Sequence, residues 1–212
     1  MTRPDVSFDV NNISSEIKNA TVKTVKEMNK IISKVKARKD VLRFQPLGKF
    51  TDLRVKVYTD ASFGNQDSQT RSTGGKVILV EDSESRKANV ISWKTKKIPR
   101  VCRSVKAAET RALEDGLDDA INTARIFREV YSVSINLKEP AQIPVFGYTD
   151  CKSLWESLHS TKQCEEKLLR NSIASMKELL ELGLVSEIQW VSTKHQLADC
   201  MTKKGNKASN CQ

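Results

Sequence analysis

The sequence of 212 residues has few of the features that mark membrane, secreted or zinc-binding proteins. No apolar run reaches the roughly 18 residues that a membrane-spanning helix needs, and the first residues contain no hydrophobic signal-peptide segment. The five cysteines form no C-x-x-C pair and there are only two histidines, so the ligand pattern of a zinc finger is missing. These absences predict an intracellular protein with neither a membrane contact nor a structural zinc.

Positive charge, in contrast, is abundant and unevenly placed. Lys and Arg number 36 against 26 Asp and Glu, which gives a net charge of +10. Residues 93–106 carry six basic side chains and no acid, whereas residues 107–120 carry five acids and one arginine. A basic segment beside an acidic one favours a protein that binds the phosphates of a polyanion and holds a cation nearby. The alternative is a solvated basic loop followed by a charged helix face.

The N-terminal part of the chain predicts a helical hairpin over residues 1–40. Apolar residues recur at spacings of three and four in both halves of this segment. Pro4 suits the first turn of a helix, and Thr21 suits the N-cap of the second helix. Two short amphipathic helices cannot bury their own apolar stripes, so the hairpin needs a partner surface. Residues 41–52, with a proline and a glycine, predict a linker.

A different pattern begins at residue 53 and predicts one α/β domain over 53–205, followed by a polar tail over 206–212. Three strands with short polar connections indicate an antiparallel meander, and two further strands follow helices. The expected strands span 53–60, 76–80, 89–93, 143–149 and 188–191, and a long helix spans 105–131. Gly116 weakens this helix without ending it. The order predicts a mixed five-stranded sheet flanked by helices.

The triplet Tyr-Thr-Asp occurs twice, at 58–60 and at 148–150, each time at the end of a predicted apolar strand. In open sheets with crossover helices, ligands gather at strand ends. Asp60 and Asp150 could therefore face each other, and two like charges that close need a cation to stay ionised. Carboxylates without His or Cys ligands favour Mg²⁺ or Mn²⁺.

Two further acids are placed to join this pair. Glu109 lies one turn into the long predicted helix, and Asp199 lies in the last predicted helix. Each of the four acids also has a structural alternative. Asp150 could be a helix N-cap, Asp60 could close a turn, and Glu109 and Asp199 could be ordinary exposed helix acids.

Six motifs follow one another along the chain, and four of them each contain one of these acids. They are Tyr58-Thr-Asp-Ala-Ser62, Arg71-Ser-Thr-Gly-Gly75, Ile91-Ser-Trp-Lys-Thr-Lys-Lys97, Ala107-Ala-Glu-Thr-Arg-Ala-Leu113, Tyr148-Thr-Asp150 and Gln196-Leu-Ala-Asp-Cys-Met-Thr-Lys203. As an ordered set they resemble the ribonuclease H domain of copia-type retrotransposon polyproteins. The N-terminal Thr2-Arg-Pro-Asp-Val-Ser-Phe8 and the helices after it resemble the end of the reverse transcriptase that precedes this domain.

The resemblance implies a ribonuclease H-like fold and metal-dependent hydrolysis of the RNA strand of RNA–DNA hybrids during reverse transcription. It places Asp60, Glu109, Asp150 and Asp199 at four acidic positions that hold two Mg²⁺ (or Mn²⁺) ions. Asp60 would bridge both ions, Glu109 and Asp150 would help hold the ion on the leaving-group side, and Asp199 would hold the water-activating ion. The implied partners are the hybrid and the upstream reverse transcriptase segment, with the chain a polyprotein fragment in a cytoplasmic virus-like particle or in the nucleus.

Substrate contacts are expected from basic side chains and hydroxyls. An RNA–DNA hybrid offers 2′-hydroxyls on one strand only, so it can be recognised without base reading. Phosphate contacts would make binding salt-sensitive and tolerant of sequence. The residues expected to contact nucleic acid are Lys94, Lys96, Lys97, Arg100, Arg103, Ser72 and Thr73.

His195 and two rival functions remain open. His195, four residues before Asp199, is a candidate for an auxiliary role in metal or product release, or is a surface histidine at a helix start. The chain could be a catalytically inactive nucleic-acid-binding relic. A transposase or integrase would need a helical glutamate after the second aspartate, for which Glu181 and Glu187 are the nearest residues. No Tyr-x-Asp-Asp signature is present, so a polymerase active site is excluded.

Overall fold

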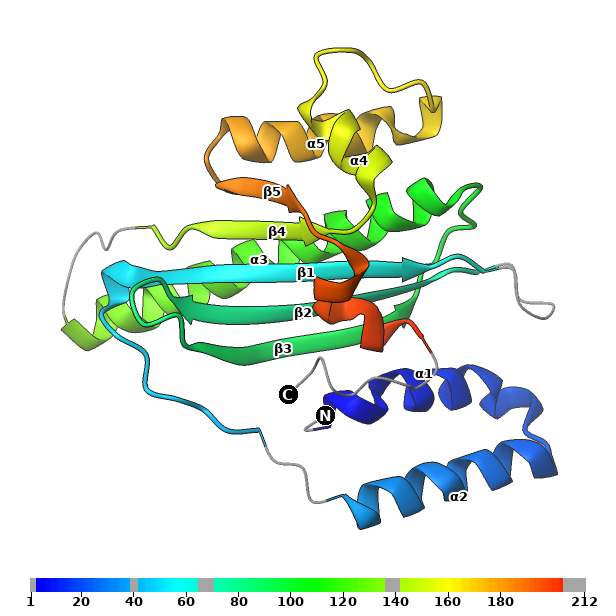
Figure 1. Cartoon of the computed structure of the whole chain (residues 1–212). Coiled ribbons are helices and arrows are strands. Elements are labelled where there is room, and N and C mark those ends of the chain that lie inside the picture. The colour runs from blue at the N-terminus through cyan, green and yellow to red at the C-terminus, as the bar shows by residue number, and fades with distance from the viewer. Residues whose placement is uncertain (1–2, 39–41, 65–70, 136–141, 204–212) are drawn as a thin grey trace.

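The computed structural model describes residues 3–38, 42–64, 71–135 and 142–203. Its centre is a five-stranded sheet in the order β3-β2-β1-β4-β5 (Figure 1). The strands are β1 (Leu53–Ser62), β2 (Thr73–Asp82), β3 (Ala88–Lys97), β4 (Val145–Thr149) and β5 (Glu187–Trp190). The first three strands pair antiparallel, whereas β4 pairs parallel with β1 and with β5. The predicted mixed sheet is confirmed.

Two strands run beyond their predicted ends because β2 pairs with both of them. Ser62 at the end of β1 and Lys97 at the end of β3 are both partners of Thr73. Asp60 therefore lies inside β1 and not at its end. The lysines expected in a basic loop lie partly on a strand, since a paired neighbour outweighs their low strand propensity.

The helix α3 (Val105–Ile135) covers one face of the sheet and forms the main core with it (Figure 1). β1 buries Val55 and Val57 completely on this face. Gly116 allows the close approach, because a Cβ there would collide with the Thr59 side chain. The prediction that the helix continues through Gly116 is confirmed.

The opposite face of the sheet carries two short 3-10 helices, η5 (Thr193–His195) and η6 (Leu197–Met201). η6 stands where the sequence predicts a final helix. Its Ala198 and Met201 are buried against Val77 and Leu79 of β2. The chain after β5 thus crosses the front of β1 and β2 (Figure 1, orange to red).

Two helices cover the β5 end of the sheet, α4 (Lys152–His159) and α5 (Arg170–Glu181), with η4 (Lys167–Leu169) before α5. Gly183 has φ +68°, so it ends α5 in the left-handed conformation that favours glycine. In the described part of the chain, no helix combines the length and the hydropathy that a membrane crossing requires.

The predicted N-terminal hairpin is present as η1 (Pro4–Val6), α1 (Ser7–Glu16), η2 (Ile17–Asn19) and α2 (Val22–Ala37). Thr21 is the N-cap of α2 and forms a capping box with Thr24, which confirms the predicted cap. α1 is fixed to the sheet, because Val6 is buried and the Ser7 and Thr95 hydroxyls are 3.3 Å apart.

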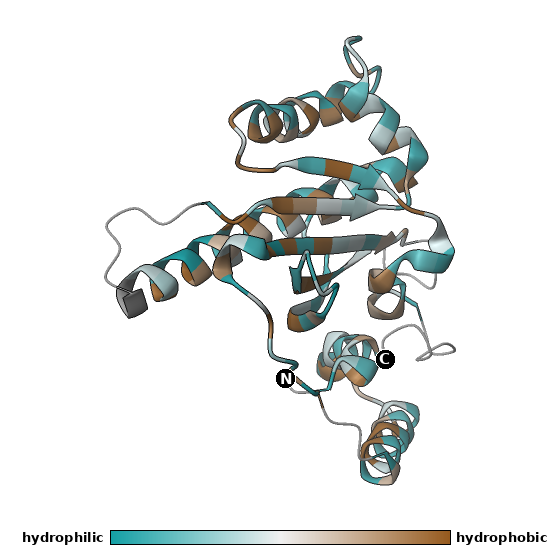
Figure 2. Cartoon of the chain, turned by 60° about the vertical axis from the view of Figure 1, so that its left-hand side comes forward, coloured by the Kyte–Doolittle hydropathy of each residue, from teal (hydrophilic) through white to brown (hydrophobic). Residues whose placement is uncertain are grey.

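α2 lies at the outside of the molecule, where Figure 2 shows hydrophobic residues along its length. The exposed apolar residues of α2 are Val22, Val25, Met28 and Ile32. The sequence predicts that the hairpin needs a partner surface. The sheet is this surface for α1, whereas the apolar stripe of α2 remains exposed.

The predicted linker lies against the body of the protein. The backbone of Gln45 exchanges two hydrogen bonds of 2.8 Å with the Asn89 side chain. In η3 (Phe50–Asp52), Phe50 stacks on Tyr131 with ring centroids 3.9 Å apart. The boundaries 1–40, 41–52, 53–205 and 206–212 stay predictions, and residues 204–212 lie outside the described residues.

Candidate active site

The two Tyr-Thr-Asp triplets lie side by side on adjacent parallel strands. Tyr58 of β1 pairs with Tyr148 of β4, and the two rings stack with centroids 4.5 Å apart. The Thr59 hydroxyl donates to the Tyr148 carbonyl over 3.5 Å. The aspartates that follow, Asp60 and Asp150, therefore reach the same end of the sheet, where the sequence predicts a metal site.

Asp60 and Asp150 have different surroundings. Asp60 is only 3% exposed inside β1, and the Thr202 hydroxyl donates to its Oδ2. Asp150 stands just beyond β4 and is partly exposed, and the Thr193 hydroxyl donates to its Oδ2 over 3.0 Å. The N-cap of the following helix is Cys151, so the alternative role of Asp150 as an N-cap is not observed.

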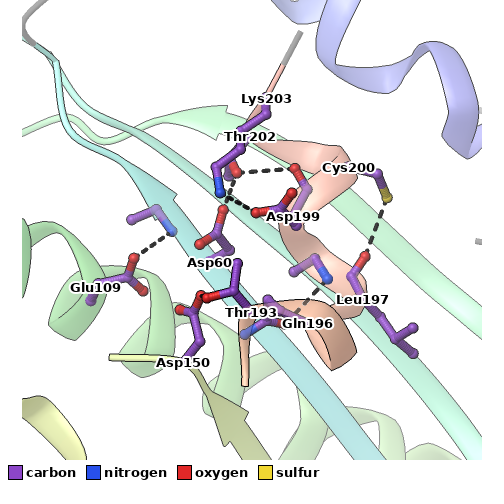
Figure 3. A network of polar contacts seen from close by, with 12 residues as sticks. Asp60, Glu109, Asp150, Thr193, Gln196, Leu197, Asp199, Cys200, Thr202 and Lys203 are labelled. Carbon is purple, nitrogen blue, oxygen red and sulfur yellow. Dashed lines mark hydrogen bonds and ion pairs between the residues drawn. The ribbon is translucent and has the colours of Figure 1, made fainter. Parts of the chain in front are cut away.

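Glu109 joins the pair from α3, on the other side of the sheet. Its Oε1 accepts a hydrogen bond of 3.0 Å from the Ala61 amide, which fixes the carboxylate beside the end of β1. Its Oε2 is buried and has no hydrogen-bond partner. Oxygen atoms of Asp60, Glu109 and Asp150 lie within 4.8 Å of one another, and Figure 3 shows the three carboxylates turned toward a common point.

The close approach of these acids changes their proton affinities. Burial and the neighbouring charges of Asp60 and Asp150 raise the pKa of Glu109 to about 9. Burial, with Asp150 and Asp199 nearby, raises the pKa of Asp60 to about 6, although the Thr202 hydrogen bond and Lys203 act in the opposite direction. The cluster of three carboxylates is therefore unfavourable when it is fully ionised.

These residues fit a hard divalent cation. All three donors are carboxylates, which Mg²⁺ and Mn²⁺ prefer. The orphaned Oε2 of Glu109 is a buried acceptor without a donor, a rare and costly state that a cation would relieve. A cation would also offset the mutual repulsion that raises the pKa of Glu109 and Asp60.

Asp199, the fourth predicted acid, lies on η6 at the rim of this cluster. It acts on Asp60 through its charge, but the three-acid cluster of the described residues does not include it. The Lys203 ammonium pairs with Asp199 Oδ1 (Figure 3). Burial opposes the charge of Lys203, while the bond to Asp199 and the charges of Asp60 and Asp150 raise its pKa. Among the described residues, Lys203 is thus a basic side chain whose charge acts on both Asp60 and Glu109.

η6 is held over β1 by features that the sequence reasoning missed. The buried Gln196 donates from Nε2 to the Thr59 carbonyl over 2.9 Å and accepts from the Ala198 amide. Gly75, the partner of Asp60 in β2, leaves room for η6, because a Cβ there would lie 2.6 Å from the Met201 Cβ. A glycine inside a strand marks such a close approach, so Gly75 carried a signal that could have been used.

Most of the predicted phosphate-binding residues line one pocket of about 380 Å³ between β2, β3 and residues 111–118 of α3, called here the basic pocket. Its basic residues are Lys76, Lys94, Lys96, Lys97, Arg100 and Arg111. Lys76 is buried and forms ion pairs with Asp115 and Asp119. The acids of the segment 107–120 therefore partly serve to hold this buried lysine.

The other predicted contact residues occupy varied positions. Arg103 is exposed and outside the lining of the basic pocket. Ser72 is 1% exposed, and its hydroxyl accepts a hydrogen bond from the Gly64 amide. Thr73 is also buried. His195 is exposed on η5, and its Nδ1 lies 2.9 Å from the Ser192 hydroxyl.

The glutamates of the transposase alternative stand apart from the acids. Glu181 ends α5 and Glu187 opens β5, and both are exposed. Within the described residues, the cluster that could hold a metal consists of Asp60, Glu109 and Asp150. This arrangement gives the transposase alternative no support.

The strand order β3-β2-β1-β4-β5 and the helices around the sheet agree with the mixed five-stranded sheet predicted from the sequence. No family model matches the chain. An uncharacterized mitochondrial protein of Arabidopsis thaliana is 28% identical over 113 residues, which cover 53% of this chain and 44% of that protein. The chain therefore matches less than half the length of this curated relative.

Several solved structures are similar at low sequence identity. The N-terminal ribonuclease H domain of a Mycobacterium tuberculosis protein is 17% identical, with a TM-score of 0.46, covering 71% of this chain and 91% of that chain. A ribonuclease H1 isolated from compost, in complex with an RNA/DNA hybrid, is 12% identical, with a TM-score of 0.43, over 68% and 88% of the chains. The ribonuclease H1 of Halobacterium salinarum is 14% identical, with a TM-score of 0.41, over 68% and 90%.

Proposed function

We propose that the chain is a metal-dependent endonuclease of the ribonuclease H type, which hydrolyses the RNA strand of RNA–DNA hybrids during reverse transcription of a copia-type retrotransposon. The observation that carries the proposal is the convergence of Asp60, Glu109 and Asp150 oxygens within 4.8 Å, with a buried Glu109 oxygen left without a donor. The hybrid found with one similar structure supports the substrate class.

Asp60, Glu109 and Asp150 would hold one Mg²⁺ or Mn²⁺, and Asp60 with Asp199 would hold a second. When bound, two such ions activate water and stabilise the leaving 3′ oxygen of a phosphodiester. The chain's own part is to aim the carboxylates. Thr202 orients Asp60, and the Ala61 amide fixes Glu109.

Substrate binding is assigned to the basic pocket at the end of β3. Its side chains from the end of β3 onward, Lys94, Lys96, Lys97 and Arg100, would follow the phosphates of the hybrid, so binding should weaken steeply with salt. Arg103 is exposed close to this pocket in the sequence and would extend the contact. His195, exposed on η5, is kept as an auxiliary residue for product release.

The exposed stripe of α2 supports the second proposed partner, the upstream reverse transcriptase segment of the same polyprotein. Val22 is 74% exposed and Val25 49%. Together with Met28 and Ile32 they form a row of exposed apolar side chains on one helix, and contiguous apolar surface is typical of an interaction site. The proposed location is a cytoplasmic virus-like particle or the nucleus.

A cleavage assay tests the function. An end-labelled RNA–DNA hybrid, duplex RNA and duplex DNA are incubated with Mg²⁺ or with EDTA, and the products are resolved on a gel. Only the RNA strand of the hybrid should be cut, and EDTA and Asp150→Asn should abolish cutting. Glu187→Gln is the matched control, because this exposed acid opens the neighbouring strand β5 and lies outside the cluster.

Cleavage by Asp150→Asn at the rate of the wild type would overturn the metal-site assignment. Salt-sensitive binding of the hybrid without any cleavage would favour the inactive nucleic-acid-binding relic. The preserved acidic cluster does not favour that alternative, because a relic gains nothing from keeping three carboxylates at a distance that raises the pKa of two of them.

A further inference from the structure

A second cavity, of about 650 Å³, separates the N-terminal hairpin from the body of the protein. We call it the hairpin groove. It is lined from the hairpin by Ser15, Thr21 and Lys23, and from the body by Arg71, Lys97 and Lys203. Its volume is within the range of cavities that hold organic ligands.

The first helix of the hairpin, α1, is tied to the body of the protein, and α2 is tied to the residues at the start of the hairpin. Val6 is 5% exposed at the junction, and Ser7 meets Thr95 of β3. The Lys34 ammonium of α2 donates to the Asp5 carbonyl over 3.0 Å. The last turn of α2 is thus joined to the start of the hairpin, and the start of α2 faces the end of β1 across the hairpin groove.

The hairpin groove leads into the candidate active site. Thr202 and Lys203 line it, while the Thr202 hydroxyl contacts Asp60 and the Lys203 ammonium contacts Asp199 (Figure 3). Lys97 lines both the hairpin groove and the basic pocket. A ligand could therefore pass from the basic pocket, around the end of β3, to the acids.

The chemistry of the lining suits a phosphate backbone. Four basic side chains line the hairpin groove against two acids, Glu16 and Glu27. Ser15, Thr21 and Ser62 also line it, and serine and threonine side chains make many of the contacts to phosphate and sugar in protein–nucleic acid complexes. The 16-residue helix α2 begins here, so the positive end of its dipole adds to the attraction.

We propose that the hairpin groove binds the phosphodiester backbone of the RNA–DNA hybrid next to the cleaved bond, so that α1 and α2 form one wall of the substrate path. This inference rests on the proposed function for the identity of the substrate. It assigns to the hairpin a binding role that does not depend on the exposed stripe of α2.

A charge introduced at one position of the hairpin groove tests the inference. Ser15 and Ser14 are adjacent exposed serines of α1, and only Ser15 lines the hairpin groove. The dissociation constant of a fluorescent RNA–DNA hybrid is measured in EDTA, without cleavage, at several salt concentrations. Ser15→Glu should weaken binding about tenfold at low salt, and Ser14→Glu should change it less than about twofold.

A lysine pair of the same design gives the second arm. Lys23→Glu removes a basic group from the hairpin groove, whereas Lys36→Glu changes an exposed lysine about 20 Å further along α2. Lys23→Glu should reduce the slope of log affinity against log salt by about one, and Lys36→Glu should leave it unchanged. All four sites are exposed, so unfolding should be unaffected, which thermal denaturation checks.

Equal effects of the two members in both pairs would overturn the inference. The outcomes also separate it from the proposed function. If the wild type cleaves the hybrid but both pairs show equal effects, the proposed role of the hairpin groove is wrong and the nuclease proposal stands. If Ser15→Glu and Lys23→Glu weaken binding selectively but the wild type does not cleave, the role of the hairpin groove stands and the nuclease proposal is wrong.

Discussion

The same three residues, Tyr-Thr-Asp, occur on β1 and on β4, in parallel strands and in register, yet their aspartates differ. In the first triplet Asp60 lies inside a ten-residue strand, paired with Gly75 and covered by η6, and is 3% exposed. In the second, Asp150 follows a five-residue strand and is partly exposed. The difference teaches that local sequence places a carboxylate at the sheet end, while the neighbouring elements decide how strongly it is desolvated.

The first prediction compares the two aspartates directly. Asp60→Asn and Asp150→Asn should each reduce cleavage by on the order of 10³-fold or more, since each removes an ionised ligand. Asp60→Asn should also stabilise the metal-free protein at pH 7 by about 1–3 kcal/mol, because it removes a buried carboxylate with a pKa of about 6. Asp150→Asn should change stability by less than about 0.5 kcal/mol. Denaturant unfolding in EDTA measures the stability of both variants. Equal stabilities would contradict the prediction that the two aspartates differ in desolvation.

The second prediction concerns the pH dependence that the buried cluster imposes. The pKa of Glu109 is about 9 in the fold against an ordinary value of 4.5, so between these values the folded protein binds more protons than the unfolded chain. The contribution of Glu109 to the free energy of unfolding is fully present below pH 4.5 and is lost as pH rises through 9. Metal-free protein should therefore lose stability from pH 5 to 9, by up to about 1.4 kcal/mol per pH unit.

Glu109→Gln should make the free energy of unfolding depend less on pH. Glu156 is an exposed acid of α4, so Glu156→Gln should leave the pH dependence as it is in the wild type. Equilibrium unfolding in EDTA at several pH values provides the comparison. A wild type and a Glu109→Gln variant with the same slope would show that the cluster is not desolvated as the structure indicates.

The third prediction tests whether η6, which lies over Asp60, makes the first triplet different from the second. Gly75→Ala should push η6 away from Asp60, because the new Cβ would lie 2.6 Å from the Met201 Cβ and 2.8 Å from Thr202 Cγ2. A cost of about 1–3 kcal/mol is expected. In Gly74→Ala the new Cβ would meet Ala112 and Ile98 at 3.6 Å, an ordinary contact, so little change is expected. Thermal denaturation and cleavage rates of Gly75→Ala and Gly74→Ala measure the effect. Similar losses of stability and activity in both variants would contradict the prediction.

The fourth prediction compares the hydroxyls that hold the two aspartates. Thr202→Val removes the donor to the buried Asp60 and should cost about 1 kcal/mol or more. Thr193→Val removes the donor to the partly exposed Asp150, where water can replace it, and should cost less than about 0.5 kcal/mol. Mn²⁺ binding by calorimetry should weaken more for Thr202→Val. The reverse order would mean that η6 does not support Asp60.

Much of the fold could be predicted because its causes are local. Alternating apolar residues gave the strands, Thr21 marked the start of α2 and Gly183 the end of α5. The lengths of β1 and β3 were underestimated, since both extend through pairing with β2 at Thr73. Lysines near the end of β3 look like loop residues until a partner strand is present.

The site was predictable in part for a similar reason. Asp60 and Asp150 shared a visible triplet, and Glu109 opened a long amphipathic helix. Gln196 and Thr202 stand in the last of the six motifs, but the motif does not reveal their partners, which are far away in sequence: Gln196 contacts Thr59 and Thr202 contacts Asp60. The hairpin groove could not be predicted either, since its two walls come from segments that only the packing of α1 on β3 brings together.

The amino-acid sequence by itself determined the order of strands and helices and the carboxylates at strand ends, because the period of apolar residues and the local cap residues act over a few neighbours. Only the tertiary structure decided which acids share one site, how far each is desolvated and where the basic side chains form pockets. Electrostatic interactions depend on distance and burial, and both are set by contacts between residues that lie far apart in the chain, such as Thr202 with Asp60 and Gln196 with Thr59.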